Sequence, residues 1–303
     1  MTLQAVPDVL RVATYNLYLG ADLSLLFGAT ATELPEVVTE LQRQLDATDF
    51  TSRARAIAAA LVRSDADIVG LQEVIRWTRD SELLVDYQDE LISALDELGA
   101  SYQVAVESLN ITGGGAGMTI AGSNIILVRA GLPVGDVDSG QFDDALVAPT
   151  PMGQVRITRS WATADVGDLT FACVHTEAYD QTVRDAQRDQ IVKLLAERTG
   201  PVVLAGDFNA LPDEVGVPAP YLDAWVEAGG EAEAGFTNGQ GADLSHADNR
   251  LSQRIDYLWV RAASVEACEV IGDQQSDRTP SGLWPSDHAG VVAAVRLRSA
   301  SRP

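Results

Sequence analysis

Residues 201–209 read PVVLAGDFN, and this stretch decides the fold more clearly than any other part of the chain. A short run rich in Val and Leu is typical of a β-strand buried inside a sheet. The run ends in Asp207 and Asn209. Polar residues just past a buried strand are held rigidly at the open edge of a sheet, where catalytic centres can be assembled. We therefore expect a sheet protein with a site at this strand end.

Other apolar runs, in distant parts of the chain, carry polar residues at one end. These residues are Asn16 (VATYN), Glu73 (DIVGLQE), His175 (FACVHTE), Asp256 (RIDYLWV) and the pair Asp287 and His288 (PSDHAGVVAAV). The strand that contains Glu73 is expected to end at that residue. One such motif alone means little, but the set predicts that several strand ends converge on one catalytic centre.

The remaining pattern predicts consecutive β-hairpins with helices between them. We expect helices at 34–62 with an interruption near 46–51, at 82–98, and at 182–198. We expect paired strands at 101–109 with 116–129, at 154–166 with 169–179, and at 254–261 with 263–272, and a mobile loop at 229–249. Strands and helices do not alternate strictly, which favours two packed sheets flanked by helices. No linker or repeat divides the chain, so a single domain over residues 1–303 is expected.

The charge of the chain bears on its partners. The net charge is −23, from 44 acidic and 21 basic residues. Such a surface repels polyanions, which disfavours sequence-independent binding of duplex DNA. A small phosphoester remains compatible with this charge, because a bound metal ion can invert the local field.

Composition also bears on class and compartment. A hydrophobic content of 46% allows a sizeable core. No apolar stretch approaches the roughly 20 residues of a membrane helix, and the N-terminus carries no secretory signal. We expect a cytoplasmic protein, or a secreted one if an export signal was removed. Cys173 and Cys268 lie in apolar contexts and are expected to be buried free thiols.

The residue types at the strand ends suit phosphodiester hydrolysis. That reaction needs a hard cation, an activated water and stabilisation of the charge on the phosphate oxygens. Magnesium prefers oxygen ligands, and Glu73 is our first candidate for its carboxylate ligand. Asp207 is expected either to contact the metal or to orient the attacking water, and Asp287 to reach the metal or that water. The amide of Asn209, which shares a face with Asp207 if the segment is extended, can hold the scissile phosphate.

Histidine is the side chain that titrates near neutrality, and it is suited to acid–base work. His288 is the candidate for this role, with Asp256 on its other ring nitrogen to fix the tautomer. His175 is expected to donate a hydrogen bond to a phosphate oxygen. For Arg159 two interpretations stay open, a contact with the substrate phosphate and a cross-strand ion pair.

The motifs NLY, LQEV, HTEAY, GDFN, RIDY and SDH occur in this order between Asn16 and His288. In the identity and order of these motifs the chain resembles the endonuclease/exonuclease/phosphatase superfamily, the group that contains pancreatic deoxyribonuclease and bacterial sphingomyelinase. The histidine at position 175 resembles those two branches, whereas the abasic-site repair branch usually has a tyrosine there. The resemblance covers nearly the whole chain.

The resemblance implies an α/β fold, a four-layer α/β/β/α sandwich with two mostly antiparallel sheets, and a Mg²⁺-dependent phosphoesterase. Mn²⁺ or Ca²⁺ are alternative cofactors. It implies metal contacts from Asn16, Glu73, Asp207 and Asp287, with Asp207 also helping to activate water. It also implies phosphate binding by His175 and Asn209 and catalysis by His288 supported by Asp256.

We therefore expect a monomeric phosphodiesterase that acts on a small or lipid-linked phosphoester. A nonspecific nuclease is the alternative within the same class, opposed by the acidic charge. A binding module without catalytic activity is the alternative from another class. It is disfavoured because such modules usually lack one of the acids or histidines, and here all are present.

Overall fold

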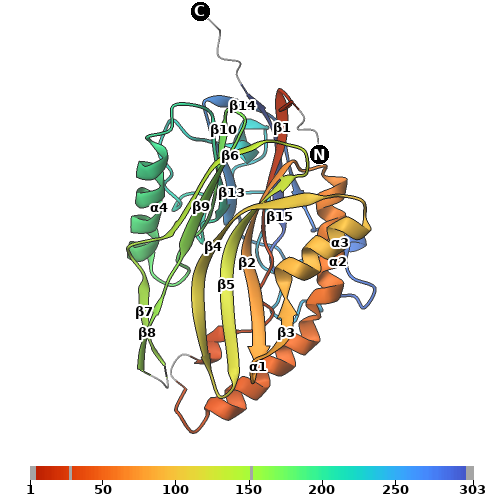
Figure 1. The fold of residues 1–303 in the computed structure, drawn as a ribbon, viewed down its shortest axis with the longest axis vertical. Helices are drawn as coiled ribbons and strands as arrows, with labels where there is room; N and C mark the ends of the chain where they lie inside the picture. The colour runs from red at the N-terminus through yellow and green to blue at the C-terminus, as the bar shows by residue number, and fades with distance from the viewer. Residues whose placement is uncertain (1–4, 27–28, 151–152, 298–303) are drawn as a thin grey trace, which may run out of the picture.

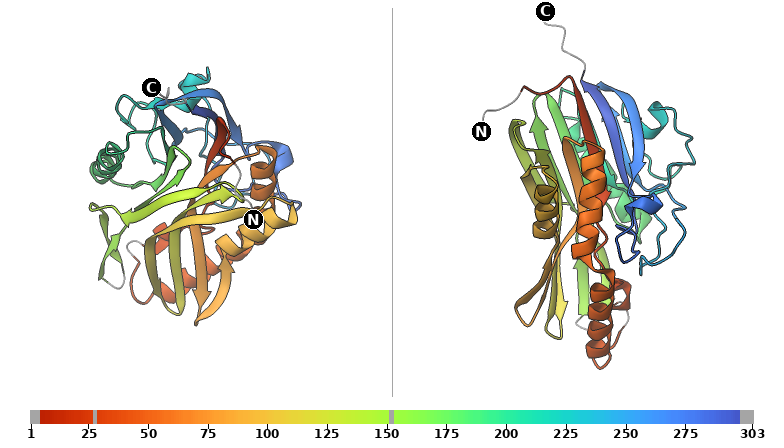
Figure 2. Two further views of the ribbon diagram at one scale, coloured as in Figure 1. Left: turned by 45° about the horizontal axis from the view of Figure 1, so that its top comes forward. Right: turned by 90° about the vertical axis from the view of Figure 1, so that its right-hand side faces the viewer.

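The structure is a computed structural model of the chain that describes residues 5–26, 29–150 and 153–297. Two β-sheets pack face to face, and helices cover their outer faces (Figure 1; Figure 2 gives two further views). The expected sandwich of two sheets flanked by helices is therefore confirmed. The ends of the expected 1–303 domain lie outside the described residues.

The first sheet has seven strands in the order β14-β15-β1-β2-β5-β4, with β3 paired to β2. β1 and β2 run parallel and the other pairs are antiparallel. The strands are β1 (Val9–Asn16), β2 (Ile68–Arg79), β3 (Glu82–Asp86), β4 (Tyr102–Gly115), β5 (Met118–Arg129), β14 (Ala263–Ile271) and β15 (Gly290–Leu297).

The second sheet has six strands in the order β12-β13-β11-β10-β9-β6, of which β10 and β11 are parallel. Its strands are β6 (Val134–Gln141), β9 (Ser160–Val166), β10 (Leu169–His175), β11 (Val202–Asp207), β12 (Leu222–Asp223) and β13 (Asp256–Arg261). A separate two-stranded sheet is formed by β7 (Leu146–Thr150) and β8 (Gly153–Ile157).

Three helices cover the first sheet and one covers the second (Figures 1 and 2). The covering helices are α1 (Leu34–Thr48), α2 (Phe50–Arg63) and α3 (Tyr87–Glu97) on the first sheet and α4 (Gln181–Leu195) on the second. The remaining short helices are η1 (Leu23–Leu26), α5 (Ala224–Glu227) and η2 (Gln275–Asp277). The helical region at 34–62 breaks as expected, at Asp49, whose carboxylate caps α2 by accepting the Ser52 N–H.

Three layers of apolar side chains hold these elements together. One layer lies between the two sheets and contains Val12, Phe171 and Val203, all fully buried. The other two lie between each sheet and its helices, for example around Ile57 and around Ile191. Within the described residues, no helix is long and apolar enough to cross a membrane.

Several expected element boundaries are wrong. Residues 82–86 form β3 and not the start of a helix, because Asp86 caps α3 and so fixes its start at Tyr87. The stretch 154–166 is two strands in different sheets, and the strand expected to end at residue 109 continues to Gly115 as β4. The strand with Glu73 continues to Arg79.

The expected pairing of 254–261 with 263–272 is also wrong. β13 lies in the second sheet and β14 in the first, because the chain crosses between the sheets at Ala262, which has φ 57°. Turn signals in the sequence mark where a strand ends, but they do not say which sheet the next strand joins.

Candidate active site

A cavity of about 480 Å³ contains most of the residues predicted for the site. Its lining includes Glu73, Arg159, His175, Asp207, Asn209, Asp287 and His288. The two other predicted residues lie directly behind this lining, because Asn16 bonds to Asp207 and Asp256 bonds to His288. Strand ends from along the chain therefore converge as the sequence predicts.

The register of three neighbouring strands brings the second sheet's contribution together. His175 at the end of β10 lies opposite Asp207 at the end of β11, and Asp207 lies opposite Asp256 at the start of β13. Asn16, at the end of β1 in the first sheet, reaches across and donates from Nδ2 to Asp207 Oδ2 at 3.0 Å. The site therefore joins the two sheets at one end of the sandwich.

His288 and Asp256 form a buried pair. His288 Nδ1 lies 2.8 Å from Asp256 Oδ2, so the carboxylate holds the proton on Nδ1 and leaves Nε2 facing the cavity. Asn238 Nδ2 lies 2.9 Å from Nε2. Burial alone would lower the pKa of His288, but the carboxylates of Asp256, Asp207 and Asp287 raise it well above its usual value.

Asp207 is at the centre of the site. Its Oδ1 accepts the Asn209 N–H at 2.9 Å, and its Oδ2 lies 3.5 Å from His175 Nε2 and 3.8 Å from His288 Nε2. Burial, and next the charge of Asp256, raise the pKa of Asp207 to about 7. Asp207, Asp256 and His288 offer ligand atoms that all lie within 4.8 Å of one another, close enough to hold one metal ion.

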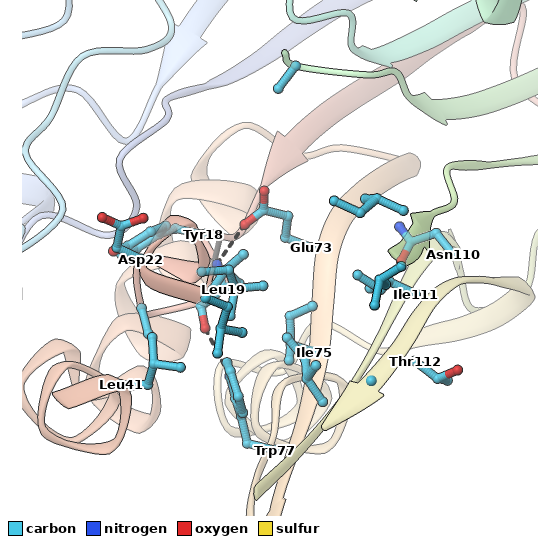
Figure 3. Close-up of a pocket in the computed structure, with 18 of the residues that line it drawn as sticks. Tyr18, Leu19, Asp22, Leu41, Glu73, Ile75, Trp77, Asn110, Ile111 and Thr112 are labelled. Atoms are coloured by element: carbon cyan, nitrogen blue, oxygen red, sulfur yellow. Dashed lines mark hydrogen bonds between the residues drawn. The ribbon is translucent and has the colours of Figure 1, made fainter. Parts of the chain in front are cut away.

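Glu73 reaches the cavity from a β-bulge. The register of β2 against β5 shifts between Leu71 and Val74, and Glu73 takes the left-handed conformation with φ 53°. Its Oε2 accepts the Leu19 N–H at 2.7 Å (Figure 3). Burial raises the pKa of the neighbouring Asp287 to about 6, and the charge of Glu73 adds to this effect. The two carboxylates therefore repel each other across the cavity.

Asn209 lies beside Asp207 for a different reason from the one expected. β11 ends at Asp207, and Asn209 has φ 48°, so the segment is turned and not extended. The Asn209 side chain donates from Nδ2 to the Thr176 carbonyl at 3.0 Å. That bond fixes the amide beside His175, the residue before Thr176.

Arg159 forms the cross-strand ion pair that was one of its two expected roles. Its Nε lies 3.4 Å from Oε2 of the fully buried Glu177, and its Nη1 lies 3.0 Å from His175 Nε2. Burial and, next, the charges of Arg159 and His288 lower the pKa of His175 well below its usual value. Arg159 also lines the cavity, so this ion pair does not exclude a contact with substrate.

Sequence reasoning missed Arg53, which is fully buried in α2. Its guanidinium donates to the carbonyls of Leu17 and Pro285 at 2.7 and 2.9 Å and to that of Tyr18 at 3.1 Å. It thereby ties the loop after Asn16 to the turn before Asp287. A signal was present, because Arg53 occupies a helical-spacing position within the apolar stripe of α2.

Two further residues were missed. Glu177 belongs to the HTEAY motif but was given no role, and Asn238 lies in the stretch that was expected to be a mobile loop. That stretch is bridged to the site, since Asn238 pairs with both Gln253 and His288. Only the tertiary structure brings Asn238 to the histidine, so no local signal could have found it.

The model of the endonuclease/exonuclease/phosphatase family matches residues 13–288. Among curated proteins there is no significant match. Members of the matched family are metal-dependent phosphoesterases and nucleases, and the chain is accordingly a metal-dependent phosphoric ester hydrolase.

Solved structures show the same fold at low sequence identity. A family protein from Bacteroides thetaiotaomicron has a TM-score of 0.61 at 18% identity, covering 96% of this chain and 98% of that one. Truncated Caenorhabditis elegans TDP2 has a TM-score of 0.58 at 20% identity (95% and 97% covered). D. rerio TDP2 complexed with a single-strand DNA product has a TM-score of 0.59 at 18% identity (95% and 99% covered). These structures show the shared fold, and because the family model matches residues 13–288, the chain belongs to the endonuclease/exonuclease/phosphatase family.

Proposed function

We propose that this chain is a Mg²⁺-dependent phosphodiesterase acting on a small or lipid-linked phosphoester, as a monomer with a single domain over residues 1–303. The observation that carries the proposal is the convergence of the His288–Asp256 pair and the Asp207 carboxylate on one cavity. Mn²⁺ and Ca²⁺ are alternative ions for the site. The location of the protein, cytoplasmic or secreted, stays a prediction.

The donor atoms of the cavity fit a hard cation. Glu73, Asp287 and Asp207 bring carboxylates to one space, and burial raises the pKa of the last two, so a divalent ion would relieve their crowding. We propose these carboxylates as its ligands, together with Asn16, whose Oδ1 would have to exchange its bond from the Tyr18 N–H for the ion. Asp256 is the less suitable member of the closely spaced group, because its Oδ2 is already bonded to His288. When bound, the ion lowers the pKa of a coordinated water and offsets phosphate charge.

The chain's own residues divide the remaining work. His175 and Asn209, fixed by Arg159 and by the Thr176 carbonyl, would orient the phosphate oxygens. Asp207 would align the attacking water and take its proton. His288, oriented by Asp256 and protonated because the surrounding carboxylates raise its pKa, would donate the Nε2 proton to the leaving alcohol oxygen as the bond from that oxygen to phosphorus breaks. Each role requires only atoms that already face the cavity or support those that do.

A nonspecific nuclease is the second candidate. It is favoured by the fold shared with TDP2 that was crystallised with a single-strand DNA product. The net charge of −23 opposes it, because nucleic-acid binding draws most of its affinity from Lys and Arg contacts with phosphates. Plasmid nicking and oligonucleotide cleavage at low salt with Mg²⁺ distinguish the two candidates.

The test is a panel of phosphodiesters assayed with Mg²⁺ and with excess EDTA. We expect turnover with Mg²⁺ that chelation abolishes and re-added metal restores. The Asp207→Ala variant serves as the control for contaminating activity. Equal turnover in Mg²⁺ and in EDTA would contradict the proposal.

A further inference from the structure

The cavity that contains the catalytic residues has a second, apolar half. Beyond Glu73 its lining becomes mainly apolar, with aliphatic and aromatic side chains from η1, α1, β2 and β5, while β4 adds Asn110, Ile111, Thr112 and three glycines. Figure 3 shows this change, with Glu73 at one end and Ile75 and Trp77 farther along β2. The polar and apolar halves are one continuous space of about 480 Å³.

The floor of the apolar half is the extension of β2 that the sequence did not predict. Ile75 and Trp77 are spaced by two residues, the period that places side chains on one face of a strand, and Glu73 joins them in the cavity lining from the bulge. A carboxylate in the lining is therefore followed along β2 by two apolar side chains. From Ile75 to Trp77 this face runs for about 7 Å. A ligand with its phosphate at Glu73 could lay a chain of that length along the strand.

The rest of the apolar lining comes from elements distant in sequence. Met118 and Ile120 of β5 lie beside Trp77 in the same sheet and widen the floor, and Leu26 of η1 and Val38 of α1 come from the elements that cover it. Met118 and Ile120 are buried, whereas Leu26 is half-buried. We call this part of the cavity, from Ile75 and Trp77 to these four side chains, the apolar groove.

The lining distinguishes between ligand classes. Among the described lining residues, Arg159 at the catalytic end is the one Lys or Arg. Tyr18 and Tyr179 line the cavity outside the apolar groove, and Trp77 within it is 2% exposed, with its Nε1 bonded to the Leu19 carbonyl. A nucleic-acid strand needs cations for its further phosphates and flat aromatic faces for its bases. A saturated hydrocarbon chain needs neither and gains from every apolar contact.

We propose that the apolar groove binds the alkyl chain of the phosphoester substrate, next to the site that hydrolyses it. This inference rests on the proposed phosphodiesterase function and narrows its substrate to phosphodiesters with an aliphatic substituent. Burying one methylene increases affinity about threefold to fourfold. The groove therefore makes kcat/KM depend on chain length.

The experiment uses a homologous series of synthetic alkyl phosphodiesters, from methyl to long-chain, hydrolysed by the full chain with Mg²⁺. We expect kcat/KM to rise about threefold to fourfold per added methylene and then to level off when the groove is full. The long-chain ester is also presented in vesicles of a neutral glycolipid that contains no phosphate, because a phospholipid would itself be a phosphodiester substrate. Turnover of the monomeric ester, of the vesicle-bound ester, or of both supports the proposal. The comparison also shows whether the enzyme takes its alkyl substrate from solution or from a lipid surface.

Two variants connect the effect to the groove. Leu26→Gln places an amide on its wall and should flatten the chain-length dependence. Ile111→Trp, at a half-buried lining position on β4, should shorten the groove and bring the plateau to a shorter chain. The matched control is Leu25→Gln, because Leu25 is the neighbouring residue of η1, is 37% exposed and does not line the cavity. It should keep the wild-type profile.

A failure of the groove assignment can be distinguished from a failure of the proposed function. If the wild-type enzyme hydrolyses the methyl ester but shows no dependence on chain length, the groove assignment is overturned and the proposed function stands. Faster turnover of oligothymidylate than of the longest alkyl ester also overturns it. If no phosphodiester is hydrolysed in a metal-dependent manner, the proposed function itself fails.

Discussion

The catalytic edge and the core between the sheets are built on the same faces of the same strands, yet they differ in chemistry. On β10 the side chains at positions 171, 173 and 175 follow one another on one face as Phe, Cys and His, and on β11 those at 203, 205 and 207 are Val, Ala and Asp. His175 and Asp207 are almost as buried as Phe171 and Val203. The site is therefore the last layer of the core, with polar groups in place of apolar ones.

That substitution makes the two regions differ in energy. The apolar layers stabilise the fold, whereas the edge contains buried carboxylates with raised pKa values. Among the described residues, Asp256 Oδ1 has no hydrogen-bond partner. Glu73 and Asn209 hold left-handed conformations, which cost on the order of 1–3 kcal/mol each. The core should therefore determine stability, and the edge should determine activity at the expense of stability.

The largest expected effect is on activity at the edge. Asp207→Ala should lower kcat/KM about 10³-fold, because it removes the carboxylate proposed to align the water. The same change should leave Tm unchanged or raise it, since one buried negative charge is relieved. Steady-state kinetics and thermal unfolding of purified protein test both parts. A large fall in Tm with little loss of activity would mean that Asp207 contributes to stability and not to activity, the opposite of what we expect for the edge.

The core should respond in the opposite way. Phe171→Ala on the same sheet should lower the free energy of unfolding by about 3–5 kcal/mol, because it leaves a cavity in the closed layer between the sheets. Activity per folded molecule should change little at a temperature where the variant is folded. Urea unfolding and active-site titration check this. Inactivity in a fully folded variant would mean that the layer also positions the site.

The same contrast explains what the sequence could predict. The strand ends could be predicted from the sequence, because a Val-rich run followed by Asp, His or Asn indicates a buried strand with a polar terminus. His175, Asp207 and Asp256 indeed meet through the register of adjacent strands. The helical region at 34–62 and its interruption were likewise predicted, since their apolar spacing and turn are local features of the chain.

What was not predictable depends on tertiary structure. The continuation of β2 to Arg79 was not predicted. A bulge at Glu73 allows a polar residue to interrupt the apolar run without ending the strand, and the sequence around the glutamate does not distinguish a bulge from a strand end. The separation of β13 and β14 into different sheets depends on packing across the sandwich. Asn238 comes to His288 through a loop bridge that no periodicity encodes.

Arg53 tests whether the two regions are separable, because it is buried like the core but holds the edge. Arg53→Met should leave the carbonyls of Leu17, Tyr18 and Pro285 unpaired and so lower the free energy of unfolding by about 2–3 kcal/mol. It should also lower kcat about tenfold, since the loop after Asn16 and the turn before Asp287 lose their common anchor.

The matched control for this position is Arg55→Met. Arg55 lies on the same helix, is exposed and pairs with Glu97 at 3.7 Å. It should change stability by less than about 0.5 kcal/mol and leave kcat unaltered. A crystal structure of Arg53→Met with both loops in place and wild-type kcat would show that Arg53 serves the core alone.

The smallest expected effect concerns the thiol that lies between the two regions. Cys173 is two residues from His175, on the same face of β10, and is fully buried, whereas Cys268, also expected to be buried, is half-buried. Burial raises the pKa of both thiols to about 12. At pH 8 only about one thiol in 10⁴ would then be ionised, so a disulfide reagent should label the native protein very slowly. Both thiols should react at once in denaturant. Rapid labelling of native Cys173, identified by mass spectrometry, would mean that the edge opens far enough to expose the core beneath it.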